Sequence, residues 1–298
     1  MTLFRSWMFI PGNQPRRLAK AGELAADVLI YDLEDAVPLT EKEQARQLVR
    51  QALEENKGRV QYVRVNDPST PFFLSDIGGV VSPETAGIVL PKAAGKEQIL
   101  AACSQLALVE AQHNLPTGVT EIVPLIESAA GLYRAYEIAT ASSRVKRLAF
   151  GSVDFTLDIG AQLTAEGKEI LYARSQLVVI SRAAEIEPPI DAVFVQVKDA
   201  DGLKRDALLA RQLGFQGKLA IHPDQLPVIH QAFSPTAEEI AEAQAIAAAF
   251  DEAVTSGSAA IQVNGKLVDY PVAARAKRVL EQAREINEPD RPKRKLKS

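Results

Sequence analysis

The sequence predicts an α/β protein whose main body is a closed (β/α)8 TIM barrel, and three observations support this prediction. The chain has 298 residues, of which 47% are hydrophobic and 24% charged. This length suits either one α/β barrel of roughly 250 residues with an extension or two modest domains. Short apolar runs alternate with helical patterns along most of the chain, as in βαβ units. Most of these runs are continuously apolar, as expected of parallel strands that are covered on both faces.

Eight β-branched and apolar runs, each bounded by turn residues, are the expected strands. They span residues 7–10, 28–33, 60–65, 87–90, 121–126, 147–151, 192–197 and 218–221. The helical patterns between them span residues 15–26, 41–55, 96–112, 129–140, 169–186 and 200–213. No linker rich in Pro, Gly or Ser divides the series. We therefore favour a closed barrel over the alternative, an open doubly wound sheet.

The chain continues beyond the eighth run with an extension that a barrel does not need. Residues 235–254 form an Ala/Glu-rich helical pattern, two apolar runs follow, and residues 272–284 form a last helical pattern. Asn264-Gly265 between the two runs is a strong hairpin signal. We expect a barrel at residues 1–232 and a helix-hairpin-helix arm at 233–288. This arm either caps its own barrel or contacts a neighbouring subunit. Residues 289–298 are expected to form a basic, disordered tail.

The charge distribution and residue usage exclude several classes of protein. The net charge is −4, and residues 291–298 carry five of the positive charges, so the rest of the chain stands at −9. Such an acidic body is poorly suited to duplex nucleic acid. The single Cys103 excludes an internal disulfide, and neither a membrane span nor a signal peptide is evident. We expect a cytoplasmic protein that binds neither nucleic acid nor membranes.

Motifs of several large enzyme classes are absent. The chain has no G-x-x-x-x-G-K-[ST], no G-x-G-x-x-G after a strand, no H-E-x-x-H and no G-x-S-x-G. Their absence argues against P-loop, dinucleotide-binding, zincin and serine-hydrolase chemistry. The chain has only three His and one Cys, so we expect no zinc site.

Nearly every expected strand ends on a polar or charged residue. These residues are Asp32, Glu34, Asp35, Arg64, Asn66, Lys92, Glu127, Ser128, Asp154, Lys198 and His222. Any one of them could simply mark where a strand meets solvent. In a parallel barrel, however, all of these ends converge on one rim, where the active sites of this architecture lie. Seven strands with polar ends therefore favour a shared site.

Glu127 and Asp154 follow neighbouring expected strands, so their carboxylates can meet at the rim. Two carboxylates with waters form a hard oxygen site suited to Mg²⁺, or to Mn²⁺. Alternatively, a buried Glu127 accepts backbone N–H groups. Arg64 offers a planar donor fork for a carboxylate or a developing oxyanion, or an ion pair inside the barrel with Asp32 or Glu34. The spacing of these residues in the sequence does not decide between the two roles of Glu127 or between the two roles of Arg64.

A set of ordered motifs resembles the citrate lyase β-subunit family. In order, they are RSWMFIPGNQPRRLAKA, ADVLIYDLEDAV, YVRVN, LPK, PLIESAAG, GSVDFTLDIGA, LYAR, GFQGKLAIHPDQ and NGKLVDYP. With the malyl-CoA and citramalyl-CoA lyases, that family belongs to the HpcH/HpaI aldolase superfamily. The resemblance covers residues 5 to about 279. It implies a (β/α)8 barrel, Mg²⁺ at the carboxyl ends of the strands and an acyl-CoA or related acyl-thioester substrate. It also implies a homo-oligomer, a trimer or hexamer, whose C-terminal arm reaches a neighbour's site.

The resemblance also implies roles for single residues, motif by motif. Glu127 of LIES and Asp154 of SVDF match the metal ligands, and Asp269 of LVDYP matches an aspartate contributed by the adjacent subunit. The acids of DLEDAV lie in the family's pocket, where they order the metal's water shell and the arginine of VRVN. The expected catalytic residues are Arg64, Asp269, Glu34 and Asp35. The expected substrate contacts are Arg64, Glu127, Asp32 and Lys92.

One departure from the family pattern precedes Asp154. Many relatives have Gly-Gly/Ala-Glu-Asp where this chain has Gly151, Ser152, Val153 and Asp154. The aspartate is kept, but the preceding acid is lost. We expect this change to alter the water shell or the choice of substrate.

The resulting hypothesis is a Mg²⁺-dependent carbon–carbon lyase. It would cleave a short 3-hydroxyacyl-CoA, such as citramalyl-CoA or malyl-CoA, into acetyl-CoA and an oxo acid, or form it from them. A close alternative is the β subunit of a citrate lyase complex, acting on citryl attached to an acyl-carrier subunit beside an α subunit. A class II aldolase acting on free oxo acids and a non-catalytic scaffold are further alternatives.

Overall fold

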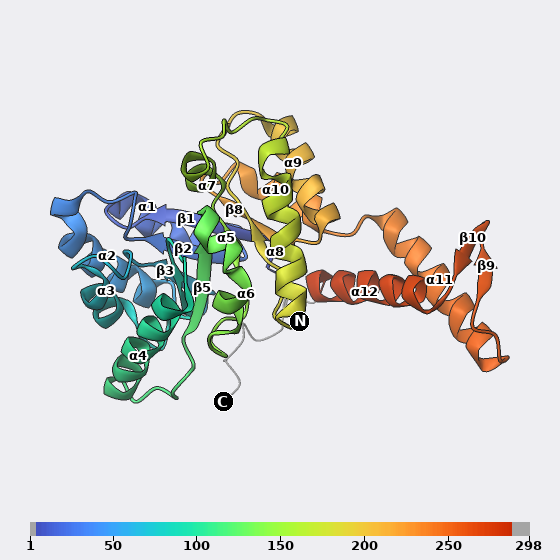
Figure 1. Ribbon diagram of the computed structural model, residues 1–298, viewed down its shortest axis with the longest axis horizontal. Coiled ribbons are helices and arrows are strands. Elements are labelled where there is room, and N and C mark those ends of the chain that lie inside the picture. Colours follow the sequence, from blue (N-terminus) through green and yellow to red (C-terminus); the bar gives the residue numbers. More distant parts are fainter. Residues whose placement is uncertain (1–3, 288–298) are drawn as a thin grey trace.

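The computed structural model describes residues 4–287 and shows a closed barrel with a projecting arm (Figure 1). Eight parallel strands pair in chain order, and β1 pairs with β8 to close the barrel. They are β1 (Ser6–Pro11), β2 (Val28–Asp32), β3 (Gln61–Arg64), β4 (Gly87–Leu90), β5 (Glu121–Ile126), β6 (Ala149–Phe150), β7 (Ile190–Asp191) and β8 (Gly217–Ala220). The predicted barrel is thus confirmed, and the open sheet is excluded. The basic tail predicted at 289–298 lies outside the described residues.

Helices follow the strands and cover the outside of the barrel. They are α1 (Pro15–Ala19), α2 (Lys42–Glu55), α3 (Phe73–Val80), α4 (Lys96–Gln112), α5 (Ala129–Tyr133), α6 (Ala135–Thr140), α7 (Ser152–Asp158), α8 (Leu171–Ala183), α9 (Ala200–Leu213) and α10 (Gln225–Phe233). Short 3₁₀ turns occur at Ala21–Glu23, Leu39–Glu41 and Lys168–Ile170. The helix predicted at 129–140 is two helices that meet at Arg134. The sequence analysis missed α10, whose Pro227 falls in the first helical turn, where proline is tolerated.

The strands are continuously apolar because each one faces two apolar layers. In β2, Val28 and Ile30 belong to the cluster inside the barrel, whereas Leu29 and Tyr31 belong to the larger cluster under the helices. Successive side chains of a strand point to opposite faces, so both sets are buried at once. The inner cluster fills the barrel below the carboxyl ends of the strands. In the barrel that the structure describes, space for a binding site therefore exists only at the rim formed by those ends.

The seventh strand was predicted at the wrong place. The prediction at 192–197 followed the apolar run, but β7 is Ile190–Asp191, and the apolar residues after it form a loop to α9. Lys198, predicted to end this strand, lies in a turn directly before the Asp199 cap of α9. The apolar pattern misplaced the strand because the second residue of β7, Asp191, is a buried acid.

A buried ion cluster holds that acid in the sheet. Asp191 is the register partner of Lys218 on β8, and their side chains pair. Arg174 of α8 contacts Asp191 at 2.9 Å and Asp206 of α9 at 2.8 Å, and Lys218 lies 2.6 Å from Asp206. Two cations therefore balance two acids where β7, β8 and two helices meet, and they anchor the short strand β7.

The arm begins after α10 and leads away from the barrel. It consists of α11 (Ala237–Thr255), β9 (Ile261–Val263), β10 (Lys266–Val268) and α12 (Tyr270–Asn287). Asn264 and Gly265 both adopt left-handed backbone angles, as a tight hairpin turn requires. Figure 1 shows α12 alongside α11 and the β9–β10 hairpin at the outer end of the arm, remote from the barrel. No helix within residues 4–287 is long and apolar enough to cross a membrane.

Replacing Lys218 with Met should destabilise the fold strongly. The substitution keeps much of the side-chain volume but leaves the buried Asp191 and the partly buried Asp206 facing Arg174 alone, and breaking a buried pair in this way costs about 3–5 kcal/mol. Urea denaturation measures the loss. The matched control is Lys277→Met, which removes an exposed pair with Asp251 and should leave the unfolding midpoint close to wild type. Equal effects of the two substitutions would contradict an anchoring role for the buried cluster.

Candidate functional site

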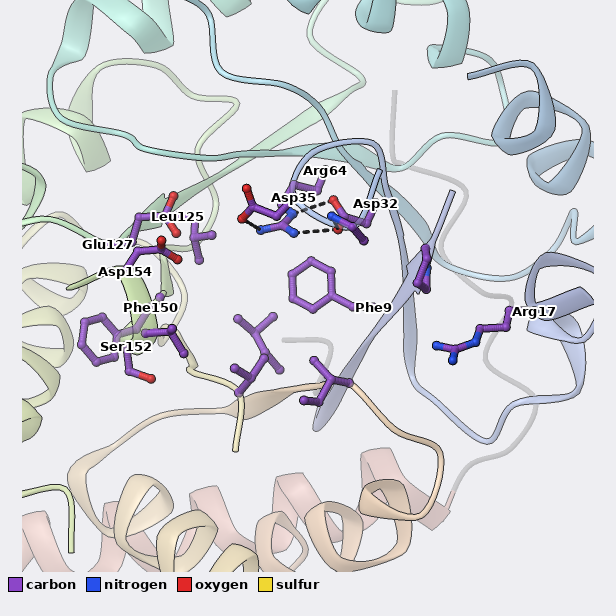
Figure 2. Close-up of a pocket in the computed structure, with 17 residues that line it drawn as sticks. Phe9, Arg17, Asp32, Asp35, Arg64, Leu125, Glu127, Phe150, Ser152 and Asp154 are labelled. Carbon is purple, nitrogen blue, oxygen red and sulfur yellow. Dashed lines mark hydrogen bonds and ion pairs between the residues drawn. The ribbon is translucent and has the colours of Figure 1, made fainter. Parts of the chain in front are cut away.

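A pocket of about 430 Å³ opens at the carboxyl ends of the barrel strands. Figure 2 shows Asp32, Asp35 and Arg64 on one part of its wall and Glu127 and Asp154 on another. The remaining lining residues are Phe9, Pro11, Arg17, Ala36, Leu125, Phe150, Gly151, Ser152, Val153, Val193, Leu219 and Ile221. The pocket brings together five of the residues predicted at the rim, and most of its polar groups come from β2, β3 and the segments that follow β5 and β6.

Asp32 and Arg64 form a two-pronged ion pair at the pocket. Each ends a strand, and they are register partners on β2 and β3. Arg64 donates from Nε to Asp32 Oδ1 at 2.7 Å and from Nη2 to Oδ2 at 2.6 Å, a two-pronged arrangement. Asp32 also accepts the backbone N–H groups of Glu34 and Ala36, which fixes the loop after β2. The ion pair considered for Arg64 is thus formed.

The same guanidinium gathers the other two acids of this loop. Arg64 Nη1 lies 3.1 Å from Glu34 Oε2 and 3.4 Å from Asp35 Oδ2, and the ring of Phe9 lies beneath the guanidinium. Burial alone would lower the pKa of Arg64, but the three acids raise it above its usual value. The guanidinium therefore stays charged, and one cation organises three carboxylates.

Lys92 connects the two parts of the site. Its Nζ lies 2.9 Å from Glu34 Oε1, and its backbone N–H donates to Glu127 Oε1 at 2.6 Å. Lys92 adopts a left-handed backbone conformation, with φ of 52°, which is unusual for a residue with a side chain. The hydrogen bond to Glu34 raises the pKa of the Lys92 ammonium. Burial raises the pKa of Glu34 even though two cations face it.

Glu127 and Asp154 form the second part of the site. Glu127 follows β5 and is buried, and Asp154 lies in the first turn of α7. Burial, reinforced by Glu34 and Asp154, raises the pKa of Glu127 to about 8, although its bond from the backbone of Lys92 opposes the rise. Gly151 permits this packing, since a Cβ there would lie 2.7 Å from Glu127 Oε2. Neither carboxylate pairs with a side-chain cation among the described residues.

This donor set fits a hard divalent cation. Within residues 4–287, no group of three or more His, Cys, Asp or Glu side chains is arranged to hold a metal. Two carboxylates supplemented by water or substrate oxygens suit Mg²⁺, which keeps several waters, better than they suit Zn²⁺. When all five carboxylates around the pocket are ionised, they exceed the cations Arg17, Arg64 and Lys92 by two negative charges. A divalent cation would balance them.

Two residues hold the backbone of the acidic loop after β2, and the sequence analysis singled out only one of them, Asn66. Lys42 is buried on α2 and donates to the backbone oxygens of Leu33 at 2.7 Å and Glu34 at 2.6 Å. Asn66 also donates to Leu33 O and is itself held by Asp76. Nothing in the pattern of α2 distinguishes Lys42 from an exposed lysine. Asn66, singled out as a strand-end residue, supports the site without lining it.

Four other candidates are not brought into the pocket of this chain. Ser128 caps α5 by accepting from the Gly131 N–H. His222 accepts the backbone N–H of Asp224, and neither it nor Lys198 lines the pocket. Asp269 lies at the start of α12 on the arm, where it accepts the Val272 N–H, and Figure 1 shows that part of the arm far from the barrel.

Comparisons with known proteins agree with this geometry. A family model described as HpcH/HpaI aldolase/citrate lyase matches residues 5–223. Citrate lyase subunit beta of Leuconostoc mesenteroides subsp. cremoris is 39% identical over 287 residues, covering 94% of this chain and 93% of that protein. Mitochondrial citramalyl-CoA lyase of Rattus norvegicus is 29% identical over 296 residues, covering 95% and 87%.

A solved structure supports the same assignment. Protein CitE from Mycobacterium tuberculosis, in complex with magnesium, acetoacetate and coenzyme A, superposes with a TM-score of 0.77 at 29% identity. The match covers 94% of this chain and 98% of that chain. The family model spans most of the barrel, and the similarity to the citrate lyase subunit spans nearly the whole chain. The chain belongs to the HpcH/HpaI aldolase/citrate lyase family.

Proposed function

We propose that this protein is a Mg²⁺-dependent carbon–carbon lyase acting on a short 3-hydroxyacyl-CoA such as citramalyl-CoA or malyl-CoA. Cleavage yields acetyl-CoA and an oxo acid, and condensation is the reverse. The observation that supports this proposal best is the pair Glu127 and Asp154, buried or half-buried without a cation and facing the same pocket as Arg64. The presence of magnesium, acetoacetate and coenzyme A in the related CitE structure supports the same chemistry.

The reaction makes two demands on the site. The 3-hydroxyl must lose its proton while the bond between C2 and C3 breaks, which produces a carbonyl group and a thioester enolate. A proton must then reach C2 of the enolate to give acetyl-CoA. Mg²⁺ held by Glu127 and Asp154 would supply Lewis-acid chemistry at the hydroxy-acid end of the substrate. The remaining work falls to protein side chains.

Arg64 is the proposed donor to oxygen atoms that gain charge. Its guanidinium is fixed by Asp32, Glu34 and Asp35, so little reorganisation is needed when charge develops, and donors of this kind contribute up to a few kcal/mol each. In this proposal Glu34 and Asp35 act by holding Arg64 and nearby water. Phe9 and Phe150 line the pocket with apolar surface that limits water access to the enolate.

Asp269 is the proposed proton-transfer group, and it must come from another subunit. In its own chain it lies on the projecting arm, away from the pocket. An arm that extends from one barrel can reach the barrel of a second copy in a symmetric oligomer, such as a trimer or hexamer. Arm closure over the neighbour's pocket would deliver the carboxylate and exclude water together.

A second candidate is the β subunit of a citrate lyase complex, with citryl carried by an acyl-carrier subunit. The 39% identity to the Leuconostoc subunit favours this candidate. The two candidates share the carbon–carbon cleavage and differ in the thioester carrier. Free CoA is the carrier in the first, and a protein-bound thioester together with an α subunit is required in the second.

Purified protein should release acetyl-CoA from citramalyl-CoA or malyl-CoA. EDTA should abolish the activity, and added Mg²⁺ or Mn²⁺ should restore it, because the site offers only hard oxygen ligands. Chromatographic detection of acetyl-CoA provides the measurement. Turnover restricted to an acyl-carrier thioester would support the citrate lyase candidate instead. Turnover of free oxo acids alone would support an aldolase, and failure to bind either Mg²⁺ or acetyl-CoA in calorimetry would support a scaffold.

Mg²⁺ affinity should depend on Glu127 and on pH. The pKa of Glu127 is raised to about 8, so its proton must leave before the metal binds. Affinity should therefore weaken about tenfold per pH unit as the pH falls below 8, and level off above it. Calorimetric titration measures this, and Glu127→Gln should remove both the binding and the pH dependence. Asp154→Asn should also weaken binding, whereas Asp158→Asn, on the same helix but outside the pocket, should not. Affinity that stays constant between pH 6 and 8 would contradict the raised pKa of Glu127, and unchanged affinity in Glu127→Gln would show that Glu127 is not a ligand.

Mixing two inactive variants should restore activity if the arm crosses between subunits. Arg64→Ala removes the barrel group and Asp269→Asn removes the arm group, so each homo-oligomer should be inactive. Random mixing at equal amounts should regenerate about one quarter of the sites, each formed by an intact barrel and a neighbour's intact arm. Unfolding and refolding the two variants together, followed by the cleavage assay, tests this. No recovery from well-folded mixtures would place the arm over its own subunit.

A further inference from the structure

Lys42 occupies a position that is unfavourable for a cation. It is the first residue of α2 and is only 4% exposed. The first turn of a helix lies at the positive end of the helix dipole, where acidic side chains are preferred. Within residues 4–287 its ammonium forms no ion pair, because the carboxylates of Asp32 and Glu34 are paired with Arg64 instead. A buried charge without such a partner costs free energy, so stability alone does not explain this lysine.

The ammonium of Lys42 binds the backbone of the acidic loop, residues 32–36. Its Nζ donates to Leu33 O at 2.7 Å and to Glu34 O at 2.6 Å. The guanidinium of Arg64, which lines the pocket, contacts the three carboxylates of the same loop. The loop therefore lies between two cations, one that holds its backbone and one that holds its side chains.

The two carbonyl groups do not need Lys42 in order to be hydrogen-bonded. Leu33 O also accepts from Asn66 Nδ2 at 3.0 Å, and Glu34 O accepts the Val37 N–H at 3.1 Å. Loss of the ammonium therefore leaves neither oxygen unpaired, and the penalty for an unsatisfied buried group does not arise. What is lost is a charge-assisted contact that fixes two consecutive peptide groups, and with them the direction of the side chain between them.

We propose that Lys42 is a positioning residue of the lyase reaction, acting through the acidic loop on the guanidinium of Arg64. This inference rests on the proposed function, in which Arg64 donates to oxygen atoms that gain charge. The carboxylates that orient Arg64 belong to the loop that Lys42 holds, so a shift of the loop moves the guanidinium as well. A displacement of about 1 Å in a reacting geometry can cost roughly 100-fold in rate.

Replacing Lys42 with Met should lower kcat for ester cleavage by about 30-fold, because the donor to the transition state is misplaced. KM and the Mg²⁺ affinity measured by calorimetry should change by less than about threefold, since Glu127 and Asp154 are held by other segments. The midpoint of urea unfolding should stay close to wild type, because neither carbonyl is left unpaired. A wild-type kcat in this variant would overturn the proposal.

Arg144→Met is the matched control, and it should give the opposite pattern. Arg144 is also a buried cation, and it donates to Thr120 O at 3.0 Å, but it pairs with Glu110 and does not line the pocket. Its loss leaves the buried Glu110 without a cation, so the urea midpoint should fall clearly while kcat of the folded protein stays at the wild-type value. If Lys42→Met lowered stability and kcat together, its role would be structural and the proposal wrong.

A double-mutant cycle tests whether Lys42 acts through Arg64. Arg64→Lys keeps the positive charge but loses the planar donor fork. In that background Lys42→Met should lower kcat by less than about threefold, because residues that act through one another are not additive. A loss as large as in the wild-type background would show that Lys42 acts by another route, contrary to the proposal.

Hydrogen exchange separates failure of this inference from failure of the proposed function. The N–H groups of Glu34 and Ala36 donate to the Asp32 carboxylate, so their exchange rates report the order of the loop. Mass spectrometry should show faster exchange in the peptide that contains them in Lys42→Met, and wild-type exchange in Arg144→Met. Unchanged exchange in Lys42→Met would refute the inference and leave the lyase proposal intact. Faster exchange, with no ester cleaved by the wild-type protein, would support the loop contact and contradict the lyase proposal.

Discussion

The site depends on the ion pairs that Arg64 forms with three carboxylates. Three carboxylates from one short loop, Asp32, Glu34 and Asp35, face the same guanidinium, and without it their mutual repulsion would oppose the loop conformation. Arg64 and Asp32 are also register partners on adjacent strands, so the pairing of β2 with β3 brings the cation to the acids. Lys42 fixes the same loop from below through two backbone oxygens. The barrel and the site therefore share one set of contacts.

Lys92 extends that arrangement to the proposed metal ligands. Its left-handed backbone, which costs about 1–2 kcal/mol for a residue with a Cβ, aims the N–H at Glu127 while the ammonium reaches Glu34. Backbone strain of this kind persists where surrounding contacts over-determine it, and it clusters at functional sites. Lys92 does not line the pocket. In this geometry it positions two acids, and its predicted contact with substrate stays a prediction.

The sequence predicted the barrel and most of the rim because both follow from local pattern. Asp32 and Arg64 end their strands, Glu127 and Asp154 follow theirs, and barrel closure then determines where all four lie. The misplacement of β7 has a different origin, since a buried Asp191 is stable only through Lys218 and Arg174, which are distant in the chain. The sequence analysis also missed Arg17 and Lys42, because residue spacing does not reveal which lysine or arginine of a helix contacts the rim of the barrel. The role proposed for Asp269 requires a second chain, which no single-chain pattern specifies.

The excess of acids also has a consequence for the order of events in the proposed reaction. When all of its carboxylates are ionised, the pocket region carries two uncompensated negative charges that oppose the approach of an anionic acyl-CoA, and the chain as a whole is acidic. A divalent cation at Glu127 and Asp154 would cancel them and lower the pKa of Glu127 toward its usual range, so metal and substrate would each favour binding of the other. The acidity of the rim and the raised pKa of Glu127 are thus both features that a bound divalent cation would offset.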